Sequence, residues 1–167
     1  MIRRLIILLL IVGCESVYIP NDCKGYAGVD AVELWGGCYD IETTTSLNLY
    51  GQSLGGDIPS EIRYLTNLTF LNLGINYFTG EFPSWIGDLT NLTYLNLIHN
   101  ELTGEIPESI CELESLYSIQ LTNNNICPPY PGCLNGNEIG SQTPENCSPC
   151  IEGEEIELWG GCYNIEE

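Results

Sequence analysis

The sequence contains very few basic residues. Only four lysines and arginines accompany 23 aspartates and glutamates, so the formal net charge at pH 7 is −19. A surface this acidic repels the phosphate backbone of nucleic acids. The chain also lacks an Asp-rich calcium-binding loop with its glycine. We therefore expect no nucleic-acid partner, and we interpret the acidic residues as a solvated surface.

The N-terminal apolar run is too short to cross a membrane as a helix, which takes about 20 residues. This run, residues 5–12, follows Arg3 and Arg4 and precedes Gly13. A charged start, a short apolar segment and small residues before a cut site are typical of a secretory signal peptide. We assign residues 1–13 to the signal peptide and residues 14–22 to a linker.

Residues 11–14, Ile-Val-Gly-Cys, resemble the lipobox of bacterial lipoproteins, whose cysteine is diacylated and becomes the new N-terminus. The resemblance implies that Cys14 is lipidated. The protein would then be exported and lipid-anchored at the cell surface or outer membrane, and the lipid would be its only contact with a membrane. In an ordinary signal peptide Cys14 would have no such role. Loss of residues 1–13 would leave Lys24 and Arg63 against 23 acids, a net charge of −21.

Histidine is nearly absent, since His99 is the only one, whereas cysteine occurs nine times. Without Cys14 the count is eight, and an even number in an exported protein predicts disulfides. Cys147 and Cys150 have the spacing of half a zinc site, but no second such pair completes it. We expect no metal and no cofactor.

Three consecutive segments of 24 residues share one apolar pattern. Residues 45–68 read TSLNLYGQSLGGDIPSEIRYLTNL, residues 69–92 TFLNLGINYFTGEFPSWIGDLTNL and residues 93–116 TYLNLIHNELTGEIPESICELESL; a broken copy fills residues 117–134. Leu-x-Leu alternation predicts a short strand with its leucines on one face, and Gly and Pro then turn the chain. One such coil cannot bury its apolar face alone, so successive coils must stack. The aligned columns are Leu47, Leu71, Leu95 and Ile119; Leu49, Leu73, Leu97 and Leu121; and Leu54, Phe78, Leu102 and Ile126.

The pattern L-x-x-L-x-L-x-x-N-x-L-x-G-x-I-P resembles the leucine-rich repeat of the plant-type subclass, over residues 33–126, with the repeats themselves at residues 45–126. The resemblance implies an α/β solenoid with a short parallel β-sheet on the concave face and loops or 3-10 turns on the convex face, closed by disulfide-bonded caps. One polar column is expected to form an internal ladder that satisfies backbone groups. Its members are Gln52, Asn76, Asn100 and Asn124.

Each end of a solenoid needs a cap. Residues 23–44 resemble the N-terminal cap of plant-type leucine-rich repeat proteins, with a tryptophan between paired cysteines, and this implies a Cys23–Cys38 disulfide. Residues 127–150 form a cysteine-rich C-terminal cap.

Four cysteines near the C-terminal cap allow three connectivities. Cys111 and Cys133 are 22 residues apart, almost one repeat. Stacking would therefore bring their Cα atoms into the range of about 4.4–6.8 Å that a disulfide accepts. Our hypothesis is Cys111–Cys133 together with Cys127–Cys147.

The end of the chain repeats the N-terminal cap. Residues 157–167 read ELWGGCYNIEE, against ELWGGCYDIE at residues 33–42, and Cys150 precedes Cys162 as Cys23 precedes Cys38. We interpret residues 151–167 as a partial second cap, and the chain as either a truncated module of a tandem protein or one that keeps this cap as a tail. Without a following strand, Trp159 and Tyr163 are expected to be poorly ordered or loosely packed.

No catalytic constellation is visible, and we expect no enzyme activity. The outward residues of the predicted strands would form an aromatic-apolar patch rimmed by amides, which suits either a protein partner or a sugar. The leucine-rich repeat resemblance, in which the concave face is the usual recognition surface, implies a surface-exposed recognition module that binds a protein or peptide there. The alternatives are a polysaccharide binder or an inhibitor of wall-degrading enzymes, a purely structural aromatic pair, or a fragment of a longer repeat protein. The candidate ligand-binding residues are Tyr50, Phe70, Asn72, Ile75, Tyr94, Asn96, Ile98, His99 and Gln120.

Overall fold

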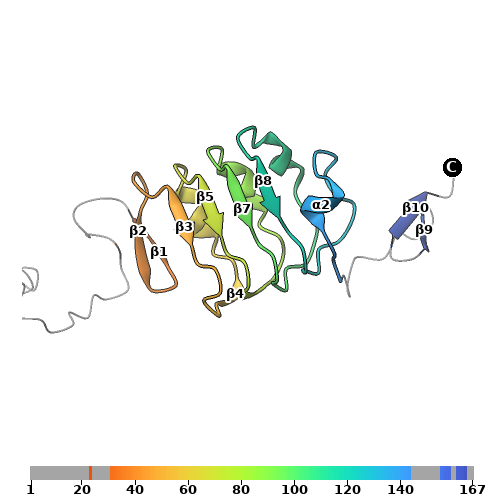
Figure 1. Ribbon diagram of the computed structural model, residues 1–167, viewed down its shortest axis with the longest axis horizontal. Coiled ribbons are helices and arrows are strands. Elements are labelled where there is room, and N and C mark those ends of the chain that lie inside the picture. Colours follow the sequence, from red (N-terminus) through yellow and green to blue (C-terminus); the bar gives the residue numbers. More distant parts are fainter. Residues whose placement is uncertain (1–22, 24–30, 144–154, 159–160, 165–167) are drawn as a thin grey trace, which may run out of the picture.

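The computed structural model describes residues 23, 31–143, 155–158 and 161–164. Its centre is a parallel sheet in the order β3 (Ser46–Asn48), β5 (Phe70–Asn72), β7 (Tyr94–Asn96) and β8 (Ser118–Gln120). Adjacent strands pair in a register of 24 residues, so Leu47 lies opposite Leu71, which lies opposite Leu95. Figure 1 shows the coils following one another as successive rungs. The predicted solenoid is confirmed.

A second strip of parallel pairing lies beyond the turn that follows each of the main strands. It consists of β4 (Gly55–Asp57) and β6 (Tyr77–Thr79), and it continues through the isolated bridges Glu81 with Thr103 and Glu105 with Cys127. Its register is 22 residues, since Gly55 pairs with Tyr77. The sequence pattern did not predict this strip.

Three short 3-10 helices form the opposite side of the coils, as the repeat resemblance implied. They are η1 (Ser60–Tyr64), η2 (Ser84–Asp88) and η3 (Glu108–Glu112), and a proline precedes each of them. Proline fixes φ and has no N–H, which suits it to the start of such a turn. Within the described residues, no helix has the length and apolarity that a membrane crossing needs.

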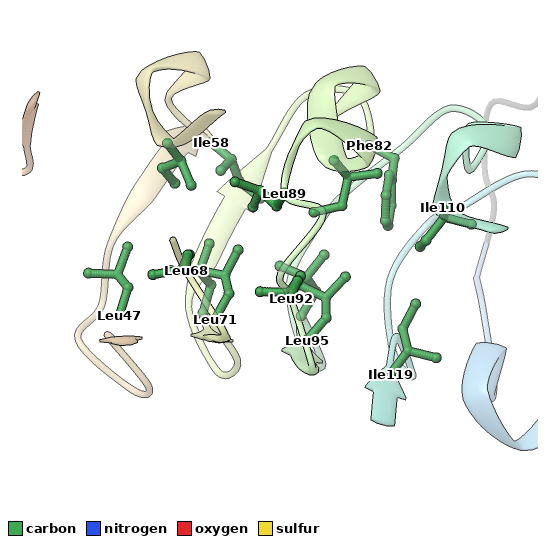
Figure 2. Close-up of a cluster of buried hydrophobic side chains, with 14 of the residues drawn as sticks. Leu47, Ile58, Leu68, Leu71, Phe82, Leu89, Leu92, Leu95, Ile110 and Ile119 are labelled. Carbon is green, nitrogen blue, oxygen red and sulfur yellow. The ribbon is translucent and has the colours of Figure 1, made fainter. Parts of the chain in front are cut away.

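The core is a column of side chains from both sides of each coil. Figure 2 shows Leu47, Leu71, Leu95 and Ile119 pointing inward from the sheet and meeting side chains such as Leu89. Leu71, Leu89 and Leu95 are at most 1% exposed. Since each fully buried leucine contributes about 1.5–3 kcal/mol of transfer free energy, this stack is the main source of stability.

A ladder of asparagines closes the turn after each strand. Asn100 donates from Nδ2 to the carbonyls of Leu73 (3.1 Å) and Leu97 (3.0 Å), and its Oδ1 accepts from the N–H of Phe78 (3.0 Å). Asn76 and Asn124 bond in the same way. Each amide therefore ties one coil to the preceding coil.

The prediction that Gln52 is the first member of this ladder was wrong. Gln52 is exposed and reaches only the carbonyl of Tyr50 (3.2 Å), since no preceding repeat offers it backbone groups. The last member of the ladder is Gln142, which the alignment of the repeats did not predict. Its Nε2 donates to the carbonyls of Leu121 and Ile139, and its Oε1 accepts from the N–H of Ile126.

An antiparallel hairpin of β1 (Ala31–Leu34) and β2 (Gly37–Asp40) caps the N-terminal end. Trp35 and Gly36 occupy its turn with φ of 47° and 78°, the positive values that a tight two-residue hairpin turn needs. Val32 and Leu34 are buried in the shared core, and the predicted Cys23–Cys38 disulfide is present with a Cα–Cα distance of 5.7 Å.

The C-terminal cap begins with the predicted Cys111–Cys133 disulfide, whose Cα atoms also lie 5.7 Å apart. Helix α2 (Gly136–Ile139) starts with a capping box between Asn135 and Glu138. The Glu138 carbonyl then accepts the N–H of Leu121, so this segment covers the end of the sheet next to β8. Cys127 is also disulfide-bonded; the side chains of Cys147, Cys150 and Cys162 lie outside the described residues.

The repeated cap motif forms a second hairpin, β9 (Glu155–Leu158) with β10 (Gly161–Asn164). Every pairing of the first hairpin recurs 124 residues later: Leu34 with Gly37 becomes Leu158 with Gly161. The two copies of the motif therefore form hairpins of the same register; that the second copy is a partial cap stays a prediction. The expectations for Trp159, for the signal peptide and for Cys14 concern residues outside those described, and the expectation for Tyr163 concerns a side chain that is not described.

Candidate functional site

The outward face of the four-stranded sheet carries an aromatic pair. Phe70 on β5 and Tyr94 on β7 lie opposite each other in the register. Their ring centroids are 4.5 Å apart and their planes differ by only 6°, so the rings are stacked face to face. Side chains at paired positions of neighbouring strands are close enough for such contact, and here the two rings lie on the face that is turned away from the core.

The residues on either side of the stack in the same column are small. Ser46 pairs with Phe70 on one side, and Ser118 pairs with Tyr94 on the other. Each ring of the pair therefore has one face covered by its partner ring, while the other face is turned toward a serine. An aromatic stack that spans only two of the four strands leaves both of its ends uncovered by other rings.

Two asparagines, Asn72 and Asn96, follow the aromatic residues two positions further along their strands, and Asn96 contacts Tyr94. The Oδ1 atoms of Asn72 and Asn96 accept the N–H groups of Gly74 (3.2 Å) and Ile98 (3.0 Å). Asn96 also donates from Nδ2 to the Tyr94 hydroxyl at 3.3 Å. Because Asn96 is only 4% exposed, it positions Tyr94 and offers little surface to a ligand.

Gly74 lets Ile98 lie across the sheet. A Cβ at position 74 would come within 2.9 Å of Asn96 Oδ1 and within 3.1 Å of Ile98 Cγ1. Glycine is therefore the residue that accommodates both of these side chains. Tyr50 occupies the same repeat position as Gly74 on the preceding coil and is exposed.

The next repeat position has a left-handed backbone in all four coils. Gly51, Ile75, His99 and Asn123 have φ between 51° and 67°. Glycine and asparagine adopt this conformation readily, whereas a β-branched residue there is strained by about 1–2 kcal/mol. Ile75 is β-branched and 44% exposed, so neither burial nor local backbone preference accounts for an isoleucine at this position.

His99 belongs to a polar row at the edge of this face. The Asn123 amide nitrogen lies 3.1–3.2 Å from the imidazole nitrogens, and Ser141 Oγ donates to Asn123 Oδ1 at 2.9 Å. The imidazole therefore contacts an amide, and the serine hydroxyl is bonded to that amide and not to the imidazole. Gln120 lies nearby on β8 and is exposed. Within the described residues, no group of three His, Cys, Asp or Glu side chains has the arrangement of a metal site.

The outward face of the sheet has no charged side chains, and the acidic residues lie elsewhere on the solenoid. Its sixteen outward positions contain no Asp, Glu, Lys or Arg, whereas residues 31–143 contain thirteen acids and one base, Arg63. The guanidinium of Arg63 lies 2.8 Å from the Asp88 carboxylate on the 3-10 side. A neutral surface therefore lies within a strongly negative molecule. The sixteen positions are Ser46, Asn48, Tyr50, Gly51, Phe70, Asn72, Gly74, Ile75, Tyr94, Asn96, Ile98, His99, Ser118, Gln120, Thr122 and Asn123.

The repeat alignment alone placed the candidate residues in the columns that the structure shows. It missed the burial of Asn96, the support that Asn96 gives to Tyr94, and the left-handed backbone at Ile75. The glycine and asparagine at the equivalent positions 51 and 123 are the one signal in the sequence that could have revealed the left-handed column.

Comparisons with known proteins agree with this architecture. The family model described as leucine rich repeat matches residues 66–126. A chain of the BIR3–SERK2 complex from Arabidopsis thaliana is 33% identical with a TM-score of 0.54, over 56% of this chain and 52% of that one. No curated protein matches. The fold is a leucine-rich repeat solenoid with disulfide-bonded caps.

Two further solved structures are receptors with bound peptides. The plant peptide hormone receptor RGFR1 in complex with RGF2 is 38% identical with a TM-score of 0.51, over 52% of this chain and 14% of that chain. A second structure is the Arabidopsis complex of the receptor kinase HAESA with the peptide hormone IDA and the co-receptor SERK1. One of its chains is 31% identical with a TM-score of 0.54, over 72% of this chain and 19% of that chain. This chain thus spans about half, or less, of the length of these structures.

Proposed function

We propose that this protein is a non-catalytic recognition module that binds a protein or peptide through the outward face of its four-stranded sheet. The observation that carries the proposal is the stacked Phe70–Tyr94 pair, which lies outside the core on a face without charged side chains. Aromatic residues are enriched in protein interfaces, and Tyr is enriched among the few residues that carry most of the binding energy; charged residues are depleted at the centre of such interfaces.

The backbone strain at Ile75 supports the same face. An exposed isoleucine with φ of 52° lowers stability relative to glycine or asparagine. Strained residues are enriched at binding and catalytic sites, where the strained group serves a contact and not the fold. The receptors RGFR1 and HAESA, similar in fold, are seen in complex with the peptide hormones RGF2 and IDA, which favours a peptide or protein ligand over a polysaccharide.

The test is affinity capture from secreted and surface proteins of the source organism, with a glycan array run in parallel. We expect the wild-type protein to retain a protein or peptide and the double variant Phe70→Ala, Tyr94→Ala to lose it. The free energy of unfolding of that variant should fall by less than about 2 kcal/mol, because a stacked pair contributes about 0.5–1.5 kcal/mol beyond its buried area. A variant that binds normally but unfolds easily would show that the pair is structural, and binding to glycans alone would select the polysaccharide alternative.

The proposed location is the cell exterior, with the N-terminus attached to a membrane through lipid on Cys14. The two described disulfides favour an oxidising compartment. Mass spectrometry of the mature N-terminus tests the anchor: we expect a diacylated Cys14, and an unmodified N-terminus elsewhere would show an ordinary signal peptide.

A further inference from the structure

The aromatic stack has an open position at each end. Strands β3, β5, β7 and β8 place Ser46, Phe70, Tyr94 and Ser118 in one row at a strand spacing of about 4.8 Å. The centroids of the two rings are 4.5 Å apart and the rings are nearly parallel, and each ring has a serine as its other neighbour in this row. A planar group above Ser46 would therefore extend the stack on Phe70, and one above Ser118 would extend it on Tyr94.

The charge of the molecule indicates which planar group fits. The described solenoid has thirteen acids and one base, and that base is paired with Asp88. Such a field attracts cations from a distance. The guanidinium of arginine is both planar and positively charged, and it stacks on aromatic faces. A lysine ammonium lacks the flat shape, and a neutral ring lacks the long-range attraction.

We infer that the ligand is an arginine-containing peptide whose guanidinium groups stack over Ser46 and Ser118 on the outer faces of Phe70 and Tyr94. This inference rests on the proposed function and specifies its ligand. The order along the row is then arginine, Phe70, Tyr94, arginine, and the ligand chain crosses the strands.

The row also sets the spacing of the two arginines. Ser46 and Ser118 are three strand spacings apart, about 14 Å. An extended peptide advances about 3.3–3.6 Å per residue, so four residues span this distance. The matching motif is Arg-x-x-x-Arg with uncharged residues between the arginines, since the surface between the two positions is neutral.

The experiment titrates the full chain with acetylated, amidated peptides and follows the backbone amide signals of Ser46 and Ser118 by NMR. The probes are Arg-Gly-Gly-Gly-Arg, the same peptide with lysine or with citrulline at both ends, and Arg-Gly-Arg. Citrulline keeps the planar shape without the charge, and lysine keeps the charge without the shape. We expect Arg-Gly-Gly-Gly-Arg to bind at least about tenfold more tightly than the other three. Arg-Gly-Arg is too short to occupy both positions at once, the citrulline peptide lacks the charge, and the lysine peptide lacks the planar group.

Two variants locate the effect. Phe70→Leu removes a ring face at similar volume and should weaken binding by about threefold, the size expected for one exposed cation–π contact. Ser46→Trp places an indole of the protein itself in one of the two positions, and it should reduce the affinity for Arg-Gly-Gly-Gly-Arg to about that of Arg-Gly-Arg, which engages one position at a time. Tyr77→Leu is the matched control, because Tyr77 is 62% exposed but lies on the second strip, and it should bind as the wild type does.

Equal binding of the lysine and arginine peptides would overturn the inference, as would unchanged binding by Phe70→Leu or tighter binding of the citrulline peptide. This experiment and the test of the proposed function can fail independently of each other. If affinity capture yields a partner that depends on Phe70 while no arginine peptide binds, the recognition function stands and the arginine assignment is wrong. If the peptides bind at the stack, the assignment stands whether or not capture yields a partner.

Discussion

The two faces of the same four strands differ in how much their residues vary. On the inward face, the four coils have Leu47, Leu71, Leu95 and Ile119 at one position, and all are buried. On the outward face, the preceding position has a serine, a phenylalanine, a tyrosine and a serine. The inward side chains must fit the coils above and below, whereas most of the outward ones are not enclosed by neighbouring coils and can vary with less effect on the fold. The repeated column therefore specifies the fold, and the varied column is where a specific function can reside.

The largest expected effect comes from the inward face. Leu95→Ala should lower the free energy of unfolding by about 3 kcal/mol, because the alanine leaves a cavity in the most central coil. Chemical denaturation measures the change. The outward neighbour, Tyr94→Ala, should cost clearly less, and equal losses at the two positions would remove the difference between the faces.

The asparagine ladder should give the next largest effect. Asn100→Ala leaves the N–H of Phe78 buried without a partner. It also removes one of the two amide donors to each of the Leu73 and Leu97 carbonyls, which keep Asn76 and Asn124. We expect a loss of about 1–3 kcal/mol. Gln52→Ala changes the same repeat position where it is exposed, and it should stay within about 0.5 kcal/mol of the wild type. A similar loss for both would mean that the repeat position matters and not its burial.

Ile75→Gly should stabilise the protein while weakening ligand binding. Glycine relieves the strain of a positive φ but loses more chain entropy on folding, so we expect a net gain of about 0.5–1 kcal/mol. The reciprocal control is Gly51→Ile, which should destabilise by about 1–2 kcal/mol at the equivalent position. Thermal unfolding measures both, and a destabilised Ile75→Gly variant would show that the isoleucine serves packing.

The smallest effect concerns the cap. Thr43 bonds to the Asp40 carboxylate through its hydroxyl and its N–H, and these bonds lower the pKa of Asp40. A depressed carboxyl pKa stabilises the folded state above the unfolded value near about 3.9, and the contribution is lost as the pH falls below it. Asp40→Asn keeps the acceptor oxygen that Thr43 needs. Its unfolding midpoint should lie slightly below that of the wild type at pH 7, approach it near pH 2 and depend less on pH between about 4 and 2. An unchanged acid dependence would assign that dependence to other carboxyl groups.

Most of the fold could be predicted from the sequence because the same pattern occurs in several consecutive repeats, and the alignment of these repeats fixes which residues are equivalent. Strand register, the inward columns and the Cys23–Cys38 and Cys111–Cys133 disulfides all follow from one period and two cap motifs. The exceptions lie where the period ends: Gln52 has no preceding repeat to bond to, and Gln142 completes the ladder from a coil of another length. The candidate site was predicted as columns only. The ring stack, the burial of Asn96 and the strain at Ile75 depend on side-chain packing and on φ, which a repeat alignment does not contain.

The two registers of the coil have a consequence for how such a chain can change. Paired residues of neighbouring coils are 24 positions apart in the main sheet and 22 positions apart in the second strip, and the ladder amides lie between the two sets of pairs. An insertion of a few residues within a central coil would disturb both pairings and the ladder together. Duplication or loss of a whole 24-residue unit would preserve all three, so we expect a change in the number of whole coils to alter the area of the outward face without disturbing either pairing.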